Sequence, residues 1–314
     1  AFYNAATGLG SQARIFMNGE EDASAGHGRC YAHVVTGTDA GKSYELGRFV
    51  VSNAAADANA SENCLANPFA QDKTLVMIDN DGGGANVNNK VLLYIGTKTN
   101  TGSEVDKAGL TNGTVKFISV AGSPAEIVNT PSRATNIVSG TAFTLSSTAS
   151  GGTTFSRPED GAWNPLNPKE YYFVTTDRID QVADGVGNQI GRSRLWRLTF
   201  ADLSNPDAGG VIDLLLVVAE GQNMLDNITV GPDGHLILLE DVGGSAHNGK
   251  VWDYDPQTDK LTLGRKHDAA RFGDIATGGT VIAATAPFNN DEETSGVIDI
   301  TAGDITIGGQ RVRH

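Results

Sequence analysis

The sequence lacks the features that mark membrane proteins and nucleic-acid-binding proteins. No apolar run reaches the ~18 residues of a membrane span, and the chain start, Ala1 onward, has neither a basic segment nor an apolar signal core. Lys and Arg (23) are outnumbered by Asp and Glu (37), which gives a formal net charge of −14. That charge disfavours binding to a phosphate backbone and favours a surface that collects cations. We therefore expect no transmembrane segment and no nucleic-acid partner.

Cysteine and the common catalytic motifs are equally scarce. The two cysteines, Cys30 and Cys64, could form one disulfide or remain two buried thiols, and the sequence does not decide between these states. No His/Cys spacing of a structural zinc site is present. The chain also has no Gly-x-Ser-x-Gly elbow, Walker loop or dinucleotide fingerprint in a strand–helix setting. These absences exclude a serine nucleophile and a nucleotide cofactor.

The sequence does contain 39 glycines and many short β-rich runs, for example 74–78, 90–96 and 194–200. Gly, Asn, Asp and Pro clusters separate many of these runs, as in a sandwich, a barrel or a propeller. No window keeps an apolar 3.6-residue period over three turns. We expect one all-β domain over 1–314, with surface insertions near 53–61 and 123–152, where small polar residues prevail.

An internal repeat favours the β-propeller among these folds. Each of three copies has an acidic residue six positions before a proline, followed by an apolar strand that ends in an acid. The acids are Glu62, Glu159 and Asp226, and the prolines are Pro68, Pro165 and Pro232. Simple turn capping would not require the same offset in every copy. We expect the three acids at equivalent places on different blades, converging on one central channel.

Converging carboxylates predict a metal site, because hard oxygen ligands select calcium, magnesium or oxidised iron. The candidate ligands are the repeated acids and members of three acidic pairs, namely Glu20, Glu21, Glu62, Glu159, Asp226, Glu240, Glu292 and Glu293. The alternative is that each acid caps a turn or pairs with a surface arginine. The segment 79–84 resembles the opening of a calcium loop, but it lacks the terminal acid, so a plain hairpin turn is favoured.

Arg157 and Arg194 are the candidate catalytic residues. Both lie near the acidic motifs, and a guanidinium beside a cation site suits a bidentate clamp on a phosphoryl group. Salt bridges to the acids are an equally good interpretation of these arginines.

At these same motifs the chain resembles the PhoX-type alkaline phosphatases and the related calcium-binding, phytase-like propellers of secreted bacterial proteins. The matching segments run over nearly the whole chain, at 19–21, 65–69, 96–99, 107–110, 157–161, 194–198, 225–227 and 292–296. The resemblance implies a six-bladed propeller outside the cytoplasm. It also implies a mixed iron–calcium cluster that hydrolyses phosphate monoesters through a metal-bound hydroxide or oxo group. By motif, the ligands carried over are Glu21, Glu159, Glu240 and Glu293.

The chain departs from this family at two places. The family has a cysteine ligand to iron immediately before the paired glutamates, and here that position is Gly19, so calcium is the expected metal and iron is doubtful. Cys30 and Cys64 lie elsewhere and are not expected to bind metal. Family members also have sequence on both sides of the matched region, which suggests that this chain is a processed or partial one.

Two functions remain open. The first is an extracytoplasmic metal-dependent phosphoesterase that acts on a phosphorylated small molecule. The second is a non-catalytic, calcium-stabilised propeller that serves as a surface or assembly module. Such a module would self-assemble or bind a surface partner.

Overall fold

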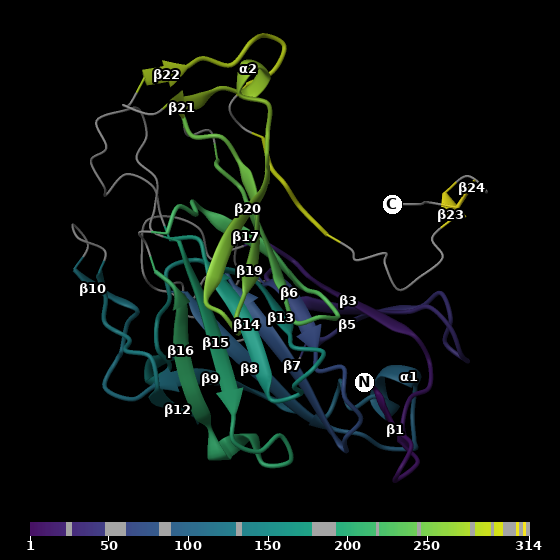
Figure 1. Ribbon diagram of the computed structural model, residues 1–314. Helices are drawn as coiled ribbons and strands as arrows, with labels where there is room; N and C mark the ends of the chain where they lie inside the picture. The colour runs from purple at the N-terminus through teal and green to yellow at the C-terminus, as the bar shows by residue number, and fades with distance from the viewer. Residues whose placement is uncertain are drawn as a thin grey trace.

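The computed structural model describes residues 1–22, 27–47, 61–81, 89–129, 134–177, 193–217, 220–243, 246–276, 280–289, 292–297, 306–307 and 310–311. Antiparallel strands dominate these residues, which confirms the all-β class (Figure 1). The α-helices are single turns, α1 (Glu104–Lys107) and α2 (Ala269–Phe272). No helix in the described ranges is long and apolar enough to cross a membrane.

The largest sheet has nine strands and consists of two four-stranded units joined by one further strand. The first unit is β6 (Ser61–Ala66), β7 (Lys73–Asn80), β8 (Lys90–Thr97) and β9 (Thr114–Val120). The second is β13 (Pro158–Trp163), β14 (Glu170–Thr175), β15 (Arg194–Phe200) and β16 (Gly210–Leu216). Strand β12 (Thr141–Ser146) pairs with both β9 and β16 and so links the outer edges of the two units.

Two smaller sheets flank this pair of units. One contains β3 (Ile15–Gly19), β4 (Cys30–Val34) and β5 (Ser43–Glu45). The other contains β17 (Leu225–Val230), β18 (Leu236–Glu240), β19 (Lys250–Asp255) and β20 (Lys260–Lys266). Short hairpins complete the described strands: β1 (Tyr3–Asn4) with β2 (Leu9–Gly10), β10 (Ile127–Asn129) with β11 (Ala134–Thr135), β21 (Asp274–Ala276) with β22 (Thr280–Ile282), and β23 (Thr306–Ile307) with β24 (Gln310–Arg311).

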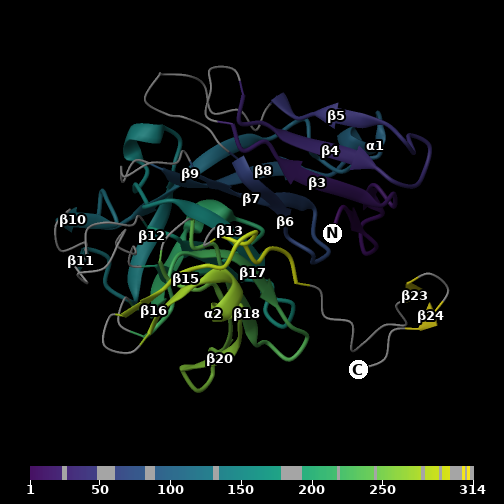
Figure 2. The ribbon, with the colours of Figure 1, turned by 90° about the horizontal axis from the view of Figure 1, so that it is seen from above.

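The first strands of the four units lie next to one another near the middle of the molecule. Strand β6 packs between β3 and β13, and β13 in turn packs against β17 (Figure 2). Residues at the start of each of these strands therefore meet in space although they are far apart in the sequence.

The units stack through their faces, because alternate residues of the central strands enter different cores. On β7, Leu75 and Met77 pack with the β13–β16 unit, whereas Val76 and Ile78 pack with the β3–β5 unit. Strand β14 alternates in the same way between the β6–β9 and β17–β20 units. A strand buried on both faces reads as a continuous apolar run, which explains the segment at 74–78.

The range 123–152 differs from the predicted surface insertion. Its β12 belongs to the main sheet, and Phe143 is only 1% exposed in the core, where its ring packs edge-on against Phe200. The Ser/Thr-rich composition concealed a strand whose alternate residues face the core. Residues 53–60 of the other predicted insertion lie outside the described residues, and Ser61 begins β6.

Candidate functional site

The three repeated acids occupy equivalent places in three hairpins. The pairing of β6 with β7 shifts register between Ser61 and Asn63, so Glu62 is the extra residue. The pairing of β17 with β18 shifts between Leu225 and Asn227, around Asp226. In the β13–β14 hairpin the irregularity spans Pro158 to Gly161 and contains Glu159. β-Bulges re-aim side chains and are frequent beside active sites, so a bulge in each copy turns its acid out of the ladder.

The residue after each repeated acid has a different role, because it connects neighbouring hairpins. The Asn63 amide donates to the Glu159 carbonyl at 3.1 Å and to the Asp160 carboxylate at 2.5 Å. Asp160 in turn accepts from the backbone N–H of Ile228 at 3.1 Å. These bonds join β6 to β13 and β13 to β17, and they set the spacing of the acids on the adjacent strands.

The acids of the hairpins converge with others from the chain. We use the name acid cluster for Glu21, Glu62, Asp81, Glu159, Asp226, Asp241 and Glu293, each of which raises the pKa of another member or has its own pKa raised by one. Burial raises the pKa of Glu62 to about 8, and the charges of Glu21 and Asp226 add to the effect. Burial and the charge of Asp241 raise the pKa of Asp226 to about 7. The cluster thus holds more negative charge than the site can stabilise by itself.

Glu159 and Glu21 follow the same trend. Burial, followed by the charge of Asp81, holds the pKa of Glu159 well above its usual range. The pKa of Glu21 is raised by burial and by Asp81, although its side chain shares a hydrogen bond with Glu62.

Arg157 is the cation within the acid cluster. Its Nη2 lies 2.7 Å from Glu159 Oε1 and 3.0 Å from Asp81 Oδ2, and its Nε also donates to Asp81. The backbone of Arg157 has φ of +56°, a conformation that is uncommon for a residue other than glycine. Strained residues concentrate at functional sites, and here the strain places the guanidinium between two buried acids.

The acid cluster offers the kind of donor atom that a hard cation prefers. Glu62 Oε2 is a buried oxygen with no hydrogen-bond partner in the described residues, an arrangement that is costly unless an ion binds there. Every cluster member offers carboxylate oxygens, which are the ligands of calcium and magnesium. In the described part of the chain, however, no three Asp, Glu, His or Cys side chains have the geometry of a formed metal site.

Three of the predicted ligands have other partners. Glu20 accepts from the backbone of Arg29 and lies 3.1 Å from the ring of His27. Glu240 is fully buried and accepts from Asn223 and the Trp252 indole, both at 2.7 Å, while burial raises its pKa to about 7. Glu292 accepts from the backbone N–H of Gly249 at 3.2 Å and retains a buried Oε2 without a partner in the described ranges.

Arg194 also lies in a different network from Arg157. Its Nη1 is 3.0 Å from Glu126 and 3.3 Å from Asp177, and all three side chains are almost completely buried. These ion pairs match the salt-bridge interpretation of Arg194. Among the described residues these contacts are buried ion pairs, and the catalytic role expected for Arg194 stays a prediction.

The predicted ligands lack two members of the acid cluster, namely Asp241, the neighbour of Glu240, and Asp81. Asp81 follows β7 in the segment for which a plain hairpin turn was favoured, and residues 82–88 of that segment lie outside the described residues. Its signal was the calcium-loop-like alternation of acids at 79 and 81.

The cysteines pair with each other. Cys30 on β4 and Cys64 on β6 form a disulfide whose Cα atoms are 6.2 Å apart. The structure thus decides between the disulfide and the two buried thiols that the sequence left open.

Comparison with known proteins gives a structural relationship only. No family model and no curated protein matches the sequence. The solved structure of Pseudomonas fluorescens PhoX in complex with vanadate, a transition state analogue, is 14% identical with a TM-score of 0.51, over 76% of this chain and 48% of that chain. The chain thus spans about half the length of that protein. At this identity the match shows a distant likeness of fold.

Two lactonase structures match more weakly. A putative 6-phosphogluconolactonase from Bacteroides uniformis is 12% identical with a TM-score of 0.35, over 88% of this chain and 74% of that chain. The periplasmic gluconolactonase of Pseudomonas aeruginosa is 13% identical with a TM-score of 0.28, over 85% and 87%. Scores this low carry no argument about fold or activity.

Proposed function

We propose that this protein is an extracytoplasmic, metal-dependent phosphoesterase that binds calcium at the acid cluster. The observation that carries the proposal is the convergence of the three bulge acids Glu62, Glu159 and Asp226, with Arg157 paired to Glu159. The PhoX structure that resembles this fold is described in complex with vanadate, a transition state analogue, which supports phosphoryl chemistry as the reaction class.

The residues that would hold the cation are Glu21, Glu62, Glu159, Asp226 and Glu293. When bound, the cation supplies positive charge that neutralises these carboxylates and polarises a phosphoryl group. Calcium is preferred over iron, because the donors are oxygens and the family cysteine is replaced by Gly19.

Arg157 would bind the substrate. Within the described residues its Nε and Nη2 donate to acids, which leaves Nη1 to donate to a phosphoryl oxygen. Held by Asp81 and Glu159, the guanidinium needs little reorganisation when charge develops in the transition state.

We also infer that the four stacked units are blades of a β-propeller, with six blades as the full complement. The support is the antiparallel order of each unit and the adjacent first strands. The Cys30–Cys64 disulfide supports an oxidising compartment, since disulfides persist in secreted and periplasmic proteins.

The proposal is tested by hydrolysis of p-nitrophenyl phosphate in the presence of calcium. We expect wild-type turnover, and a fall of roughly a hundredfold in kcat for Arg157→Lys, which keeps the charge but loses the planar fork. The exposed Arg14→Lys is the matched control and should retain full activity. Equal activity of wild type and Arg157→Lys would contradict the role of Arg157.

A non-catalytic, calcium-stabilised module is the second candidate, and Gly19 favours it. A Cβ at position 19 would lie 1.9 Å from the carbonyl oxygen of Ser61, so this backbone has no room for the family cysteine. If calcium raises the melting temperature but the protein hydrolyses no aryl phosphate, the result favours this function over the phosphoesterase.

A further inference from the structure

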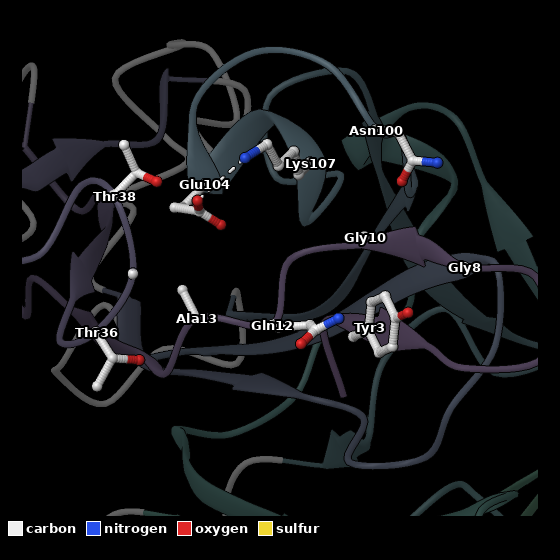
Figure 3. A pocket seen from close by; sticks show the side chains of 11 residues that line it. Tyr3, Gly8, Gly10, Gln12, Ala13, Thr36, Thr38, Asn100, Glu104 and Lys107 are labelled. Carbon is white, nitrogen blue, oxygen red and sulfur yellow. Dashed lines mark hydrogen bonds and ion pairs between the residues drawn. The ribbon is translucent and has the colours of Figure 1, made fainter.

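A cavity lies away from the acid cluster, between the N-terminal hairpin, the turn after β4 and helix α1. Its volume is about 420 Å³, within the ~300–1,000 Å³ of small-molecule sites. Figure 3 shows Tyr3 and Gln12 on one side of the cavity and the Glu104–Lys107 pair on the opposite side. None of its lining residues belongs to the acid cluster.

The cavity walls are fixed by hydrogen bonds from several segments. The N–H of Gly10 donates to Thr99 at 3.0 Å, and the N–H of Glu104 donates to the Asp39 carboxylate at 2.8 Å. A capping box between Ser103 and Asp106 fixes the start of α1. A cavity formed in this way needs little ordering when a ligand binds, which lowers the entropic cost of binding.

A glycine keeps the cavity open on one side. Gly37 has φ of +90°, and a Cβ there would lie 3.1 Å from the Ala13 side chain and 3.6 Å from Glu104 Cδ. Any larger residue at position 37 would therefore enter the space between these two walls.

The lining combines unused polar groups with balanced charge. The Tyr3 hydroxyl, the Gln12 amide and the Thr38 hydroxyl line the cavity and form no hydrogen bond to any described residue. The charged lining residues in the described chain are Glu104 and Lys107, which pair at 3.1 Å. Glu104 is only 6% exposed and also accepts from the Ser11 hydroxyl. The wall thus presents donors, acceptors and an aromatic ring without a net charge.

We propose that this cavity binds a neutral polyhydroxylated ligand of hexose size. Sugar hydroxyls donate and accept at once, and an amide and hydroxyls in the wall can meet both needs. The Tyr3 ring offers an apolar face to the C–H groups of the sugar, while its hydroxyl remains polar. Glu104 and Lys107 neutralise each other's charge, so the cavity has no free positive charge to bind a phosphorylated or carboxylated ligand.

The test is calorimetric titration of the full chain with glucose, galactose, mannose and N-acetylglucosamine, and with glucose 6-phosphate as the charged arm. We expect at least one neutral sugar to bind. Gln12→Ala and Tyr3→Ala should each weaken it about tenfold, equivalent to ~1.4 kcal/mol. Ala13→Leu should abolish binding because its side chain fills the cavity. The exposed Gln257→Ala, in the turn between β19 and β20, should bind as wild type.

Several outcomes would overturn the proposal. They are the absence of binding by every neutral sugar, tighter binding of glucose 6-phosphate than of glucose, or unchanged affinity in both Gln12→Ala and Ala13→Leu. Melting curves of each variant separate loss of binding from loss of fold. Because these variants leave the acid cluster intact, the result is independent of the phosphoesterase proposal.

Discussion

Neighbouring residues within the repeat have divided roles. In the first two copies the first residue, Glu62 or Glu159, joins the acid cluster, whereas the second, Asn63 or Asp160, bonds to the adjacent strand. A bulge makes the division possible, because it breaks the strict alternation of faces that a regular strand imposes. In each of these copies two adjacent residues therefore fix both the position of a cluster acid and the spacing of neighbouring strands.

Asn63→Ala should destabilise the fold. The substitution removes two donors and leaves the half-buried Asp160 carboxylate with only its backbone partners, at a cost of about 1–3 kcal/mol. Urea unfolding followed by circular dichroism measures the loss. Asn205→Ala, at an exposed position outside the strands, is the control. A loss below ~0.5 kcal/mol, typical of surface substitutions, would show that the bond to Asp160 contributes little.

We expect the free energy of unfolding to rise at alkaline pH because of Lys98. It is only 2% exposed and donates to the carbonyl of Lys73 at 2.7 Å, and burial lowers its pKa from 10.5 to about 8. Between these pH values the unfolded chain holds a proton that the folded chain has lost, so unfolding becomes less favourable as pH rises through 8. The gain should be ~2 kcal/mol after allowance for solvent screening.

The measurement is the free energy of unfolding in urea between pH 7 and 9.5, for wild type and Lys98→Met. Methionine keeps the apolar stem without the titrating group. The difference in free energy of unfolding between wild type and Lys98→Met should therefore shrink as pH increases. A difference that is constant over this range would mean that Lys98 stays protonated in the folded state.

At the scale of elements, the four stacked units depend on contacts between sheets. Strands β7 and β14 bury both faces, so each of the two inner units, β6–β9 and β13–β16, contributes to two cores and cannot be removed without exposing both. The Cys30–Cys64 disulfide reinforces one of these junctions, because it links β4 of the β3–β5 unit to β6 of the β6–β9 unit.

Removal of the disulfide in Cys30→Ala/Cys64→Ala should reduce stability by about 3–4 kcal/mol, from the loop entropy of the 34-residue separation alone. Each single substitution should cost about as much, since either one opens the loop. Differential scanning calorimetry with and without reductant provides the measurement. A melting temperature that does not respond to verified reduction would contradict a stabilising role.

At the scale of the whole molecule, the acid cluster places part of the negative charge of the chain where the units meet. The net charge is −14, and the acid cluster draws its members from strands and turns of all four units. Carboxylates buried together repel one another and lose hydration, so a multivalent cation should act on the stability of the complete assembly.

Chelation should therefore lower the melting temperature, and calcium should restore it. A cation that binds only the folded state adds about 4 kcal/mol at a thousandfold excess over its Kd. NaCl at matched ionic strength is the control for general screening. The variant Glu62→Gln, which removes one repelling charge, should reduce the difference between calcium-loaded and stripped protein. Equal melting temperatures after verified metal removal would exclude the calcium site and both proposed functions that depend on it.

The all-β class and the equivalence of Glu62, Glu159 and Asp226 could be predicted from the sequence, because strand periodicity and a repeated offset are local properties of the chain. The same repeated offset also predicted that these three acidic side chains converge in space. The chain could not show that Arg157 joins the acids while Arg194 is buried with Glu126 and Asp177, since both arginines lie beside similar motifs.

Those outcomes depend on which strands become neighbours. The packing of β6 between β3 and β13 brings Glu21 to Glu62, whereas the pairing of β18 with β19 brings Glu240 to the Trp252 indole. The pairing of Cys30 with Cys64 and the incorporation of β12 into the main sheet have the same origin. Long-range contacts of this kind follow from the burial of whole sheet faces, which no local pattern of residues specifies.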